Sequence, residues 1–255
     1  MYDIATRKHA LSLVAQGRSL NAVSKHTGIS RAALRSWQTR LEPLQAPSDC
    51  PRCMGLPRLP DDPAAYAYLL GLYLGDGCIS RLGRTYSLRI ACADAWPGLI
   101  DECEHAMRAV RPDNRVSRSQ HPGCKAVTAY SNHWPCLFPQ HGPGKKHERP
   151  IVLAPWQEEI VEAEPWGLLR GLVHSDGCRI TNWTTRIVGG RAKRYEYPRY
   201  FFTNKSGDLL RLCGATLDRV GVEWRYTRRG GDDYNVSVAR RESVALMDVH
   251  VGPKW

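Results

Sequence analysis

Two aspartates, Asp76 and Asp176, occupy matching surroundings in the two halves of the chain. Each follows an apolar segment of helical length and precedes a glycine: residues 69–77 read LLGLYLGDG and residues 169–177 read LRGLVHSDG. A carboxylate in the last turn of a helix faces the negative end of the helix dipole, so aspartate is unfavourable there. Its occurrence in both copies of an internal repeat indicates a chemical role.

Phosphodiester hydrolysis is the chemistry that such a pair of acids could support. The reaction needs a hydroxide-like nucleophile and neutralisation of the charge that grows on the phosphate, and a hard divalent cation supplies both. Mg²⁺ binds carboxylate oxygens and keeps several waters, so one or two acids are enough to hold it. We therefore expect Asp76 and Asp176 to be catalytic residues and Mg²⁺ ligands, provided that their two helices lie side by side.

Small residues four apart in each motif would allow this pairing. They are Gly71 and Gly75 in the first copy and Gly171 and Ser175 in the second. Small side chains at this spacing let two helix backbones approach closely. The sequence therefore predicts that the motif helices pack against each other through these four positions.

The similarity between the two copies extends well past the motifs. The hydrophobic periodicity after the first motif predicts strands at 86–91, 115–119 and 126–130 and helices at 96–110 and 132–138. After the second motif it predicts strands at 179–185, 199–203, 223–227 and 234–239 and helices at 207–220 and 242–249. Residues 140–164, rich in Gly, Pro and charge, are expected to form a connector.

The two motifs, their spacing and this order of elements resemble the LAGLIDADG homing endonucleases over residues 64–252. Residues 141–147 and 166–171 also resemble the stretch before the second motif in that family. The resemblance implies an α+β fold of two pseudo-symmetric αββαββα halves, each laying an antiparallel sheet into the major groove of double-stranded DNA. It also implies a pseudosymmetric monomer in which Asp76 and Asp176 lie over the scissile phosphates.

The chain departs from the family pattern at a basic residue that usually ends the last strand of each half. Residues 127–131 contain no lysine, and Arg240 and Arg241 follow the last strand of the second half. Lys125, Lys145 and Lys205 are the substitutes that we expect from the sequence.

His174, inside the second motif, is more simply a packed core residue than a metal ligand.

Three functions stay open. The first is a Mg²⁺-dependent, site-specific DNA endonuclease, and the second is a catalytically silent DNA-binding transcription regulator. A recombinase or transposase ranks behind both.

The net charge of +11 and the pI near 9.4 favour a polyanionic partner such as DNA. The excess charge lies in residues 1–45 (+5) and residues 179–229 (+8). The run 186–199 is predicted to be a basic hairpin tip that contacts DNA, with a flexible solvated loop as the alternative. The predicted DNA contacts of the repeats are Arg81, Arg84, Arg89, Arg186, Arg191, Lys193, Arg194 and Arg199.

Residues 1–45 have the pattern of a small all-α helix-turn-helix domain. Ser19 and Ser30 are predicted N-caps, and the Thr27–Gly28 turn separates the last two helices. The third helix would present Arg31, Arg35, Gln38 and Arg40 to DNA. An ordinary three-helix bundle with a charged surface is the alternative.

The segment 46–63 is expected to be a semi-rigid linker, because residues 42–63 contain six prolines. Cys50 and Cys53 within it form a C-x-x-C pair, which is half of a zinc site; two reduced thiols are the simpler alternative. The expected divisions of the chain are therefore 1–45, 46–63, 64–139, 140–164 and 165–255.

The cysteine count and the hydropathy indicate the cellular compartment in which we expect the protein. Nine cysteines are an odd number, and no N-terminal apolar run resembles a signal peptide, so a disulfide framework is not expected. No apolar run is long enough to span a membrane. We expect a cytoplasmic protein associated with the nucleoid.

Overall fold

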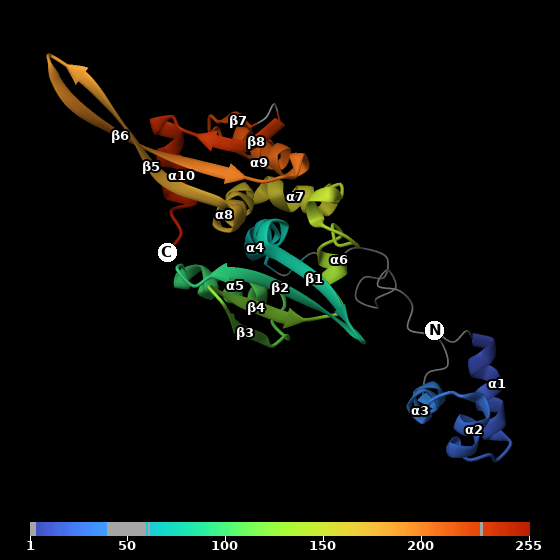
Figure 1. Ribbon diagram of the computed structural model, residues 1–255. Coiled ribbons are helices and arrows are strands. Elements are labelled where there is room, and N and C mark those ends of the chain that lie inside the picture. Colours follow the sequence, from blue (N-terminus) through green and yellow to red (C-terminus); the bar gives the residue numbers. More distant parts are fainter. Residues whose placement is uncertain (1–3, 40–59, 61, 230–231) are drawn as a thin grey trace. The chain divides into compact units, whose positions relative to one another are not determined.

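The structure, a computed structural model, describes residues 4–39, 60, 62–229 and 232–255 (Figure 1). The chain divides into two compact units, residues 1–51 and residues 52–255, which we describe separately. None of the described helices is long and apolar enough to cross a membrane. The seven cysteines of the described part of the chain are free thiols.

The described part of the N-terminal unit, residues 4–39, contains three helices, α1 (Ile4–Ala15), α2 (Leu20–Thr27) and α3 (Arg31–Thr39). The two predicted caps are confirmed: Ser19 Oγ accepts a hydrogen bond from Ala22 N, and Ser30 Oγ accepts one from Ala33 N, both at 3.2 Å. Gly28 ends α2 with a φ of 71°, a left-handed conformation that glycine adopts without strain.

This unit has a small core of its own, in which Ala10, Val23 and Leu34 are fully buried. The side chains of Arg31, Arg35 and Gln38 are exposed on α3. Arg40, Cys50 and Cys53 lie outside the described residues, so the fourth predicted contact and the predicted zinc site stay predictions. The DNA-binding role of α3 also stays a prediction.

The second unit is a duplicated α+β fold, as predicted. Its first half consists of α4 (Pro63–Asp76), β1 (Gly77–Leu82), β2 (Thr85–Ala93), α5 (Pro97–Val110), β3 (Val116–His121), β4 (Cys124–Tyr130) and α6 (Trp134–Leu137). Its second half consists of α8 (Pro165–Asp176), β5 (Gly177–Val188), β6 (Arg191–Thr203), α9 (Gly207–Arg219), β7 (Arg225–Arg229), β8 (Asp232–Val238) and α10 (Arg241–His250). Each half forms one four-stranded antiparallel sheet, in the equivalent orders β1-β2-β4-β3 and β5-β6-β8-β7.

The predicted connector at 140–164 proved more structured than expected. It contains a 3₁₀ turn, η2 (Lys146–Glu148), and a helix, α7 (Pro155–Ala163). Gln157 is completely buried in α7 and its side-chain amide donates to the Tyr66 hydroxyl at 2.7 Å. A helix this short is not stable alone, and packing against α4 and α8 stabilises it, which local composition did not reveal.

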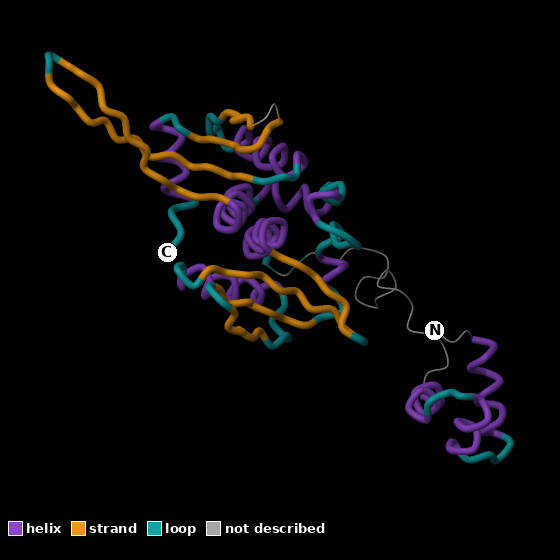
Figure 2. Tube along the Cα trace, in the orientation of Figure 1, coloured by secondary structure: helices purple, strands orange, loops and turns teal. Residues whose placement is uncertain are grey.

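The two motif helices α4 and α8 lie side by side between the two sheets (Figures 1 and 2). Their backbones touch at two glycines. A Cβ at Gly71 would lie 2.6 Å from Leu168 O, and a Cβ at Gly171 would lie 2.2 Å from Tyr68 O. One turn later, Gly75 faces Ser175. The structure thus places the four small residues at the helix crossing.

Each sheet buries one face against helices and leaves the other open. In β2, Leu88, Ile90 and Cys92 are buried, whereas the alternating residues Arg89 and Ala91 are exposed. This alternation is typical of an antiparallel sheet that covers a core on one side only.

Strands β5 and β6 form one long hairpin, residues 177–203, that extends well past the rest of its sheet (Figure 2). Only Tyr200 to Thr203 of β6 pair with β8. The prediction that one strand stops at 185 and the next starts at 199 was wrong, because pairing continues to Val188 and Arg191. The alternative of a solvated loop at 186–199 was also wrong. Gly189 and Gly190, with φ of 58° and 78°, form the two-residue turn that lets pairing continue to Val188 and Arg191.

A bidentate ion pair fastens the base of the long hairpin to α10. Arg179 Nε and Nη2 donate to the two Asp248 carboxylate oxygens at 2.6 and 2.9 Å. The Tyr200 hydroxyl also donates to Asp248, at 2.6 Å. The hydrogen bonds from Arg179, and secondarily the one from Tyr200, hold the pKa of Asp248 below its usual range.

Gly171→Ala is expected to destabilise the second unit by about 3 kcal/mol or more, because the new methyl group meets backbone that cannot move aside. Gly207→Ala is the matched control, since a Cβ there meets only the flexible end of Arg211 at 3.3 Å. Chemical denaturation of the two variants makes the comparison, and equal stabilities would contradict the close backbone contact.

Asp248→Asn is expected to cost about 1 kcal/mol of unfolding free energy at neutral pH, the scale of one hydrogen-bonded, partly exposed charge pair. A carboxyl whose folded-state pKa is lowered stabilises the protein above its unfolded pKa and loses that contribution as pH falls. The difference from wild type should therefore shrink below about pH 4. Urea unfolding at several pH values tests this, with Glu159→Gln on the exposed side of α7 as control. A pH-independent difference would contradict it.

Candidate active site

Asp76 and Asp176 are the last residues of the two abutting helices α4 and α8. The Asp176 Oδ2 atom lies 3.2 Å from the position that a Cβ at Gly75 would occupy, so this carboxylate reaches across to the turn that carries Asp76. The condition set by the sequence, that the two motif helices lie side by side, is met in the structure. The roles of the two aspartates as metal ligands and catalytic residues remain a proposal.

Both carboxyl groups carry an electrostatic cost. Burial raises the pKa of Asp76, and the charge of Asp176 raises it further. Burial likewise raises the pKa of Asp176. The Asn204 side-chain amide lowers this pKa, because it donates to Asp176 Oδ2 at 2.7 Å and stabilises the charged form. Asp76 is exposed and Asp176 is half-buried, and two acids at helix C-termini are stabilised by nearby positive charge.

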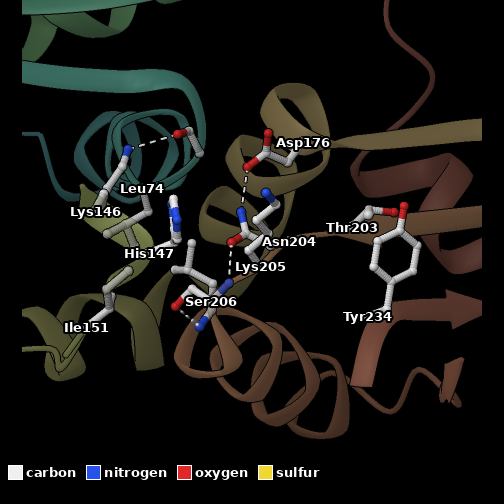
Figure 3. Close-up of a pocket in the computed structure, with 12 residues that line it drawn as sticks. Leu74, Lys146, His147, Ile151, Asp176, Thr203, Asn204, Lys205, Ser206 and Tyr234 are labelled. Atoms are coloured by element: carbon white, nitrogen blue, oxygen red, sulfur yellow. Dashed lines mark hydrogen bonds between the residues drawn. The ribbon is translucent and has the colours of Figure 1, made fainter. Parts of the chain in front are cut away.

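Lys146 in η2 supplies one such charge (Figure 3). Its ammonium group donates to three carbonyl oxygens at the end of the first motif, those of Tyr73, Gly75 and Gly77, the last two at 2.8 Å. It also lies 5.0 Å from the centre of the Tyr73 ring. Burial lowers the pKa of Lys146 to about 8, against the opposing effect of the two aspartates.

Lys254, after α10, supplies the second charge. Its ammonium group donates to Ser175 O at 2.7 Å, the carbonyl equivalent to that of Gly75 in the other half. The following residue is anchored: Gly98 N donates to Trp255 O at 2.9 Å, and the Trp255 indole lies against Gly98. Burial lowers the pKa of Lys254, and Asp76 opposes this most strongly.

Sequence reasoning missed both of these lysines. Lys145, one of the three expected substitutes, is exposed and pairs with Glu148 at 3.1 Å. A signal did exist, because Lys146 and Lys254 each follow a Gly-Pro pair near the end of a repeat, in GPGKK (142–146) and GPK (252–254).

A cavity of about 380 Å³ opens beside Asp176 (Figure 3). Its polar lining includes Lys146, His147, Asn204 and Lys205, the last being another of the expected substitutes. The cavity therefore combines one carboxylate with several hydrogen-bond donors, an environment suited to an anionic group next to a cation.

The donor set at the two acids fits a hard divalent cation. Carboxylate and backbone carbonyl oxygens are the ligands that Mg²⁺ prefers, with water and substrate phosphate completing the shell. Among the described residues, no group of three or more His, Cys, Asp or Glu side chains is arranged to hold a metal. If the protein binds such an ion, the Asp76 and Asp176 carboxylates are the side chains that would hold it, next to carbonyls bonded by two ammonium groups.

His174 is a core residue. Its side chain is buried, its Nδ1 lies 3.1 Å from the Tyr68 hydroxyl, and its ring packs edge-on against Trp255. Burial lowers its pKa to about 3, so the imidazole is neutral. This agrees with the simpler of the two interpretations.

The register of the long hairpin separates its basic side chains between two faces. Arg199, Lys193 and Arg191 pair with Ile180, Arg186 and Val188, so these residues share the open face, opposite the buried Tyr200 and Phe202. The exposed Arg194 lies on the other face, where it pairs with Glu196 at 2.8 Å and covers the Trp183 ring at 4.9 Å.

The open face of the first sheet is much less basic. Arg89 is exposed on it, beside Thr128 of β4. Arg84 lies in the turn between β1 and β2. Arg81, which pairs with Tyr86, lies on the opposite face of the sheet and is exposed near the end of β1.

No protein-family model and no curated protein matches the chain. Solved structures to which it is similar are those of LAGLIDADG proteins. I-DmoI in complex with DNA and Mn is 14% identical, with 74% of this chain and 97% of that chain covered and a TM-score of 0.47. I-AabMI bound to uncleaved DNA is 10% identical, with 72% and 83% covered and a TM-score of 0.46.

The N-terminal LAGLIDADG domain of WhiA is also similar, at 13% identity, with 77% and 87% covered and a TM-score of 0.44. All three TM-scores are below 0.5.

Proposed function

We propose that the protein is a site-specific double-stranded DNA endonuclease that uses a divalent cation, Mg²⁺ being the expected one. The observation that carries the proposal is the position of Asp76 and Asp176 at the ends of two abutting helices, between two sheets with open faces. Duplex DNA is a two-stranded substrate with approximate twofold symmetry, which a duplicated protein can match without dimerising. We therefore also propose a monomer.

The long hairpin supports the DNA-binding part of the proposal. The major groove admits a two-stranded β-ribbon, and lysine and arginine reach both phosphates and guanine edges there. On the open face, Lys193 lies 5.4 Å from the Tyr195 ring centre and Arg199 lies 5.2 Å from that of Tyr197. These stacked cations face outward together with Arg186 and Arg191, so the second half would make most of the phosphate contacts.

The candidate active site supports the cleavage part. When bound, the cation would supply a hydroxide-like nucleophile and neutralise the charge on the phosphate. Asp76 and Asp176 would hold it, and Asn204 orients the Asp176 carboxylate. His147 and Lys205 line the adjoining cavity, where they would receive phosphate oxygens.

A catalytically silent, DNA-binding transcription regulator is the second candidate. It is favoured by the ammonium groups of Lys146 and Lys254, which already balance the two acids without a metal. The three-helix N-terminal unit, with Arg31 and Arg35 exposed, would serve either function as a second DNA contact.

Asp76→Asn and Asp176→Asn are each expected to lower DNA cleavage by about 100-fold or more and to leave DNA binding intact. The measurement incubates the protein with Mg²⁺ and a plasmid library of randomised targets and sequences the cut ends. Asp101→Asn, an exposed residue on α5, is the control. Wild-type protein that binds specific DNA and never cuts it would favour the regulator instead.

Lys193→Gln is expected to weaken DNA binding and to reduce the slope of log K against log salt by about 0.9, the value for one lost phosphate contact. Arg194→Gln removes a neighbouring charge on the opposite face and is expected to change the slope little. Fluorescence anisotropy with duplex DNA at several salt concentrations compares the two. An equal loss in both variants would argue against the open face as the DNA surface.

A further inference from the structure

The two missed lysines reach equivalent points of the candidate site from the segments that follow the two halves. Lys146 comes from the turn after the first half, and Lys254 follows the last helix of the second. Each donates to the carbonyl of the residue directly before a motif aspartate, at 2.8 Å to Gly75 O and 2.7 Å to Ser175 O. The pseudo-twofold symmetry of the fold thus extends to a pair of ammonium groups.

We propose that Lys146 and Lys254 are built-in cation surrogates: their ammonium groups occupy the cation positions of the acid pair, keep the motif helices together without metal, and must be displaced before a divalent cation binds. This rests on the proposed function in so far as Asp76 and Asp176 are the metal ligands. It makes metal binding a competition within the chain.

The charge balance supports this competition. Two carboxylates at the C-terminal ends of abutting helices repel each other and face the negative ends of both helix dipoles. Two ammonium groups cancel their formal charge, so a site that holds both lysines attracts a divalent cation less than the bare acid pair would. Displacing either ammonium restores the attraction.

A simple helix cap would not account for the crosswise arrangement. Lysine near a helix C-terminus can satisfy free carbonyls by itself. Yet Lys146, which is bonded to α4, feels the charge of Asp176 on α8 most strongly, and Lys254, bonded to α8, feels that of Asp76 on α4. Each ammonium is therefore bonded to a carbonyl of one helix and lies in the electrostatic field of the carboxylate on the other.

Neighbouring contacts hold both lysines in place without a metal. Arg149 ties down the loop before Lys146 by donating to Pro143 O at 3.1 Å and Gly144 O at 3.3 Å. On the other side, Trp255 packs against Gly98 and fixes the segment that carries Lys254. The ammonium groups are thus positioned in advance.

Mn²⁺ binding to the DNA-free protein, followed by electron paramagnetic resonance of the free ion, tests the proposal. Lys146→Met and Lys254→Met are each expected to bind Mn²⁺ about tenfold more tightly than wild type, a typical coupling between two binding events. Lys145→Met, which removes the adjacent exposed lysine, is expected to bind like wild type. Unchanged or weaker binding in both site variants, or no binding in any variant, would overturn the proposal.

Thermal unfolding gives a second readout. In EDTA, Lys254→Met should unfold at a lower temperature than Lys145→Met, and Mn²⁺ should restore it while leaving wild type nearly unchanged. If Lys146→Met does not fold, Lys146→Arg, which keeps the charge, should match wild type in Mn²⁺ affinity, and a large gain would overturn the proposal.

The outcome is independent of cleavage. Tighter Mn²⁺ binding by the lysine variants without any DNA cleavage would refute the endonuclease function and support the cation-surrogate role of Lys146 and Lys254. DNA cleavage with unchanged Mn²⁺ affinity in the lysine variants would support the endonuclease function and refute the surrogate role.

Discussion

The direct backbone contact between α4 and α8 is the constraint on which the rest of this structure depends. Gly71 and Gly171 leave no room for a Cβ at the crossing, so the two helices approach closely and end at the same place. Because the helices end together, the two aspartates lie at the same end of the helix pair, each helix is followed directly by the first strand of its sheet, and the two halves share one core. A larger residue at either glycine would separate the helices and with them the acids.

That contact also creates an electrostatic problem. It brings two carboxylates and the negative ends of two helix dipoles into one half-buried region, where burial disfavours charge. Lys146 and Lys254 place positive charge there, and both are half-buried, at some cost to their charged forms. The balance of two acids and two lysines explains how such a region forms before any ion or DNA is present.

The two halves share one topology and differ in the surface that they expose. The second half carries the long hairpin, with Arg191, Lys193 and Arg199 on its open face, whereas the open face of the first sheet carries Arg89 among small and neutral side chains. A pseudo-symmetric helix pair flanked by two sheets with different open faces suits a DNA site whose two half-sites differ. In the proposed function, the second half would supply affinity and the first half would read its half-site through shorter polar side chains.

The sequence by itself determined the features that depend on neighbouring residues. The Ser19 and Ser30 caps and the duplicated order of helices and strands were predictable because hydrogen bonds and periodicity within a few residues decide them. Only the tertiary structure decided the rest. Helix α7 is stabilised by packing on α8 and on the distant α4, and Lys146 and Lys254 reach the carbonyls before the acids across 71 and 79 residues of chain, which no local rule specifies. Arg194 and Lys193 face opposite sides in any strand, but only the packing of β6 against α9 and α10 decides that the face of Lys193 stays open.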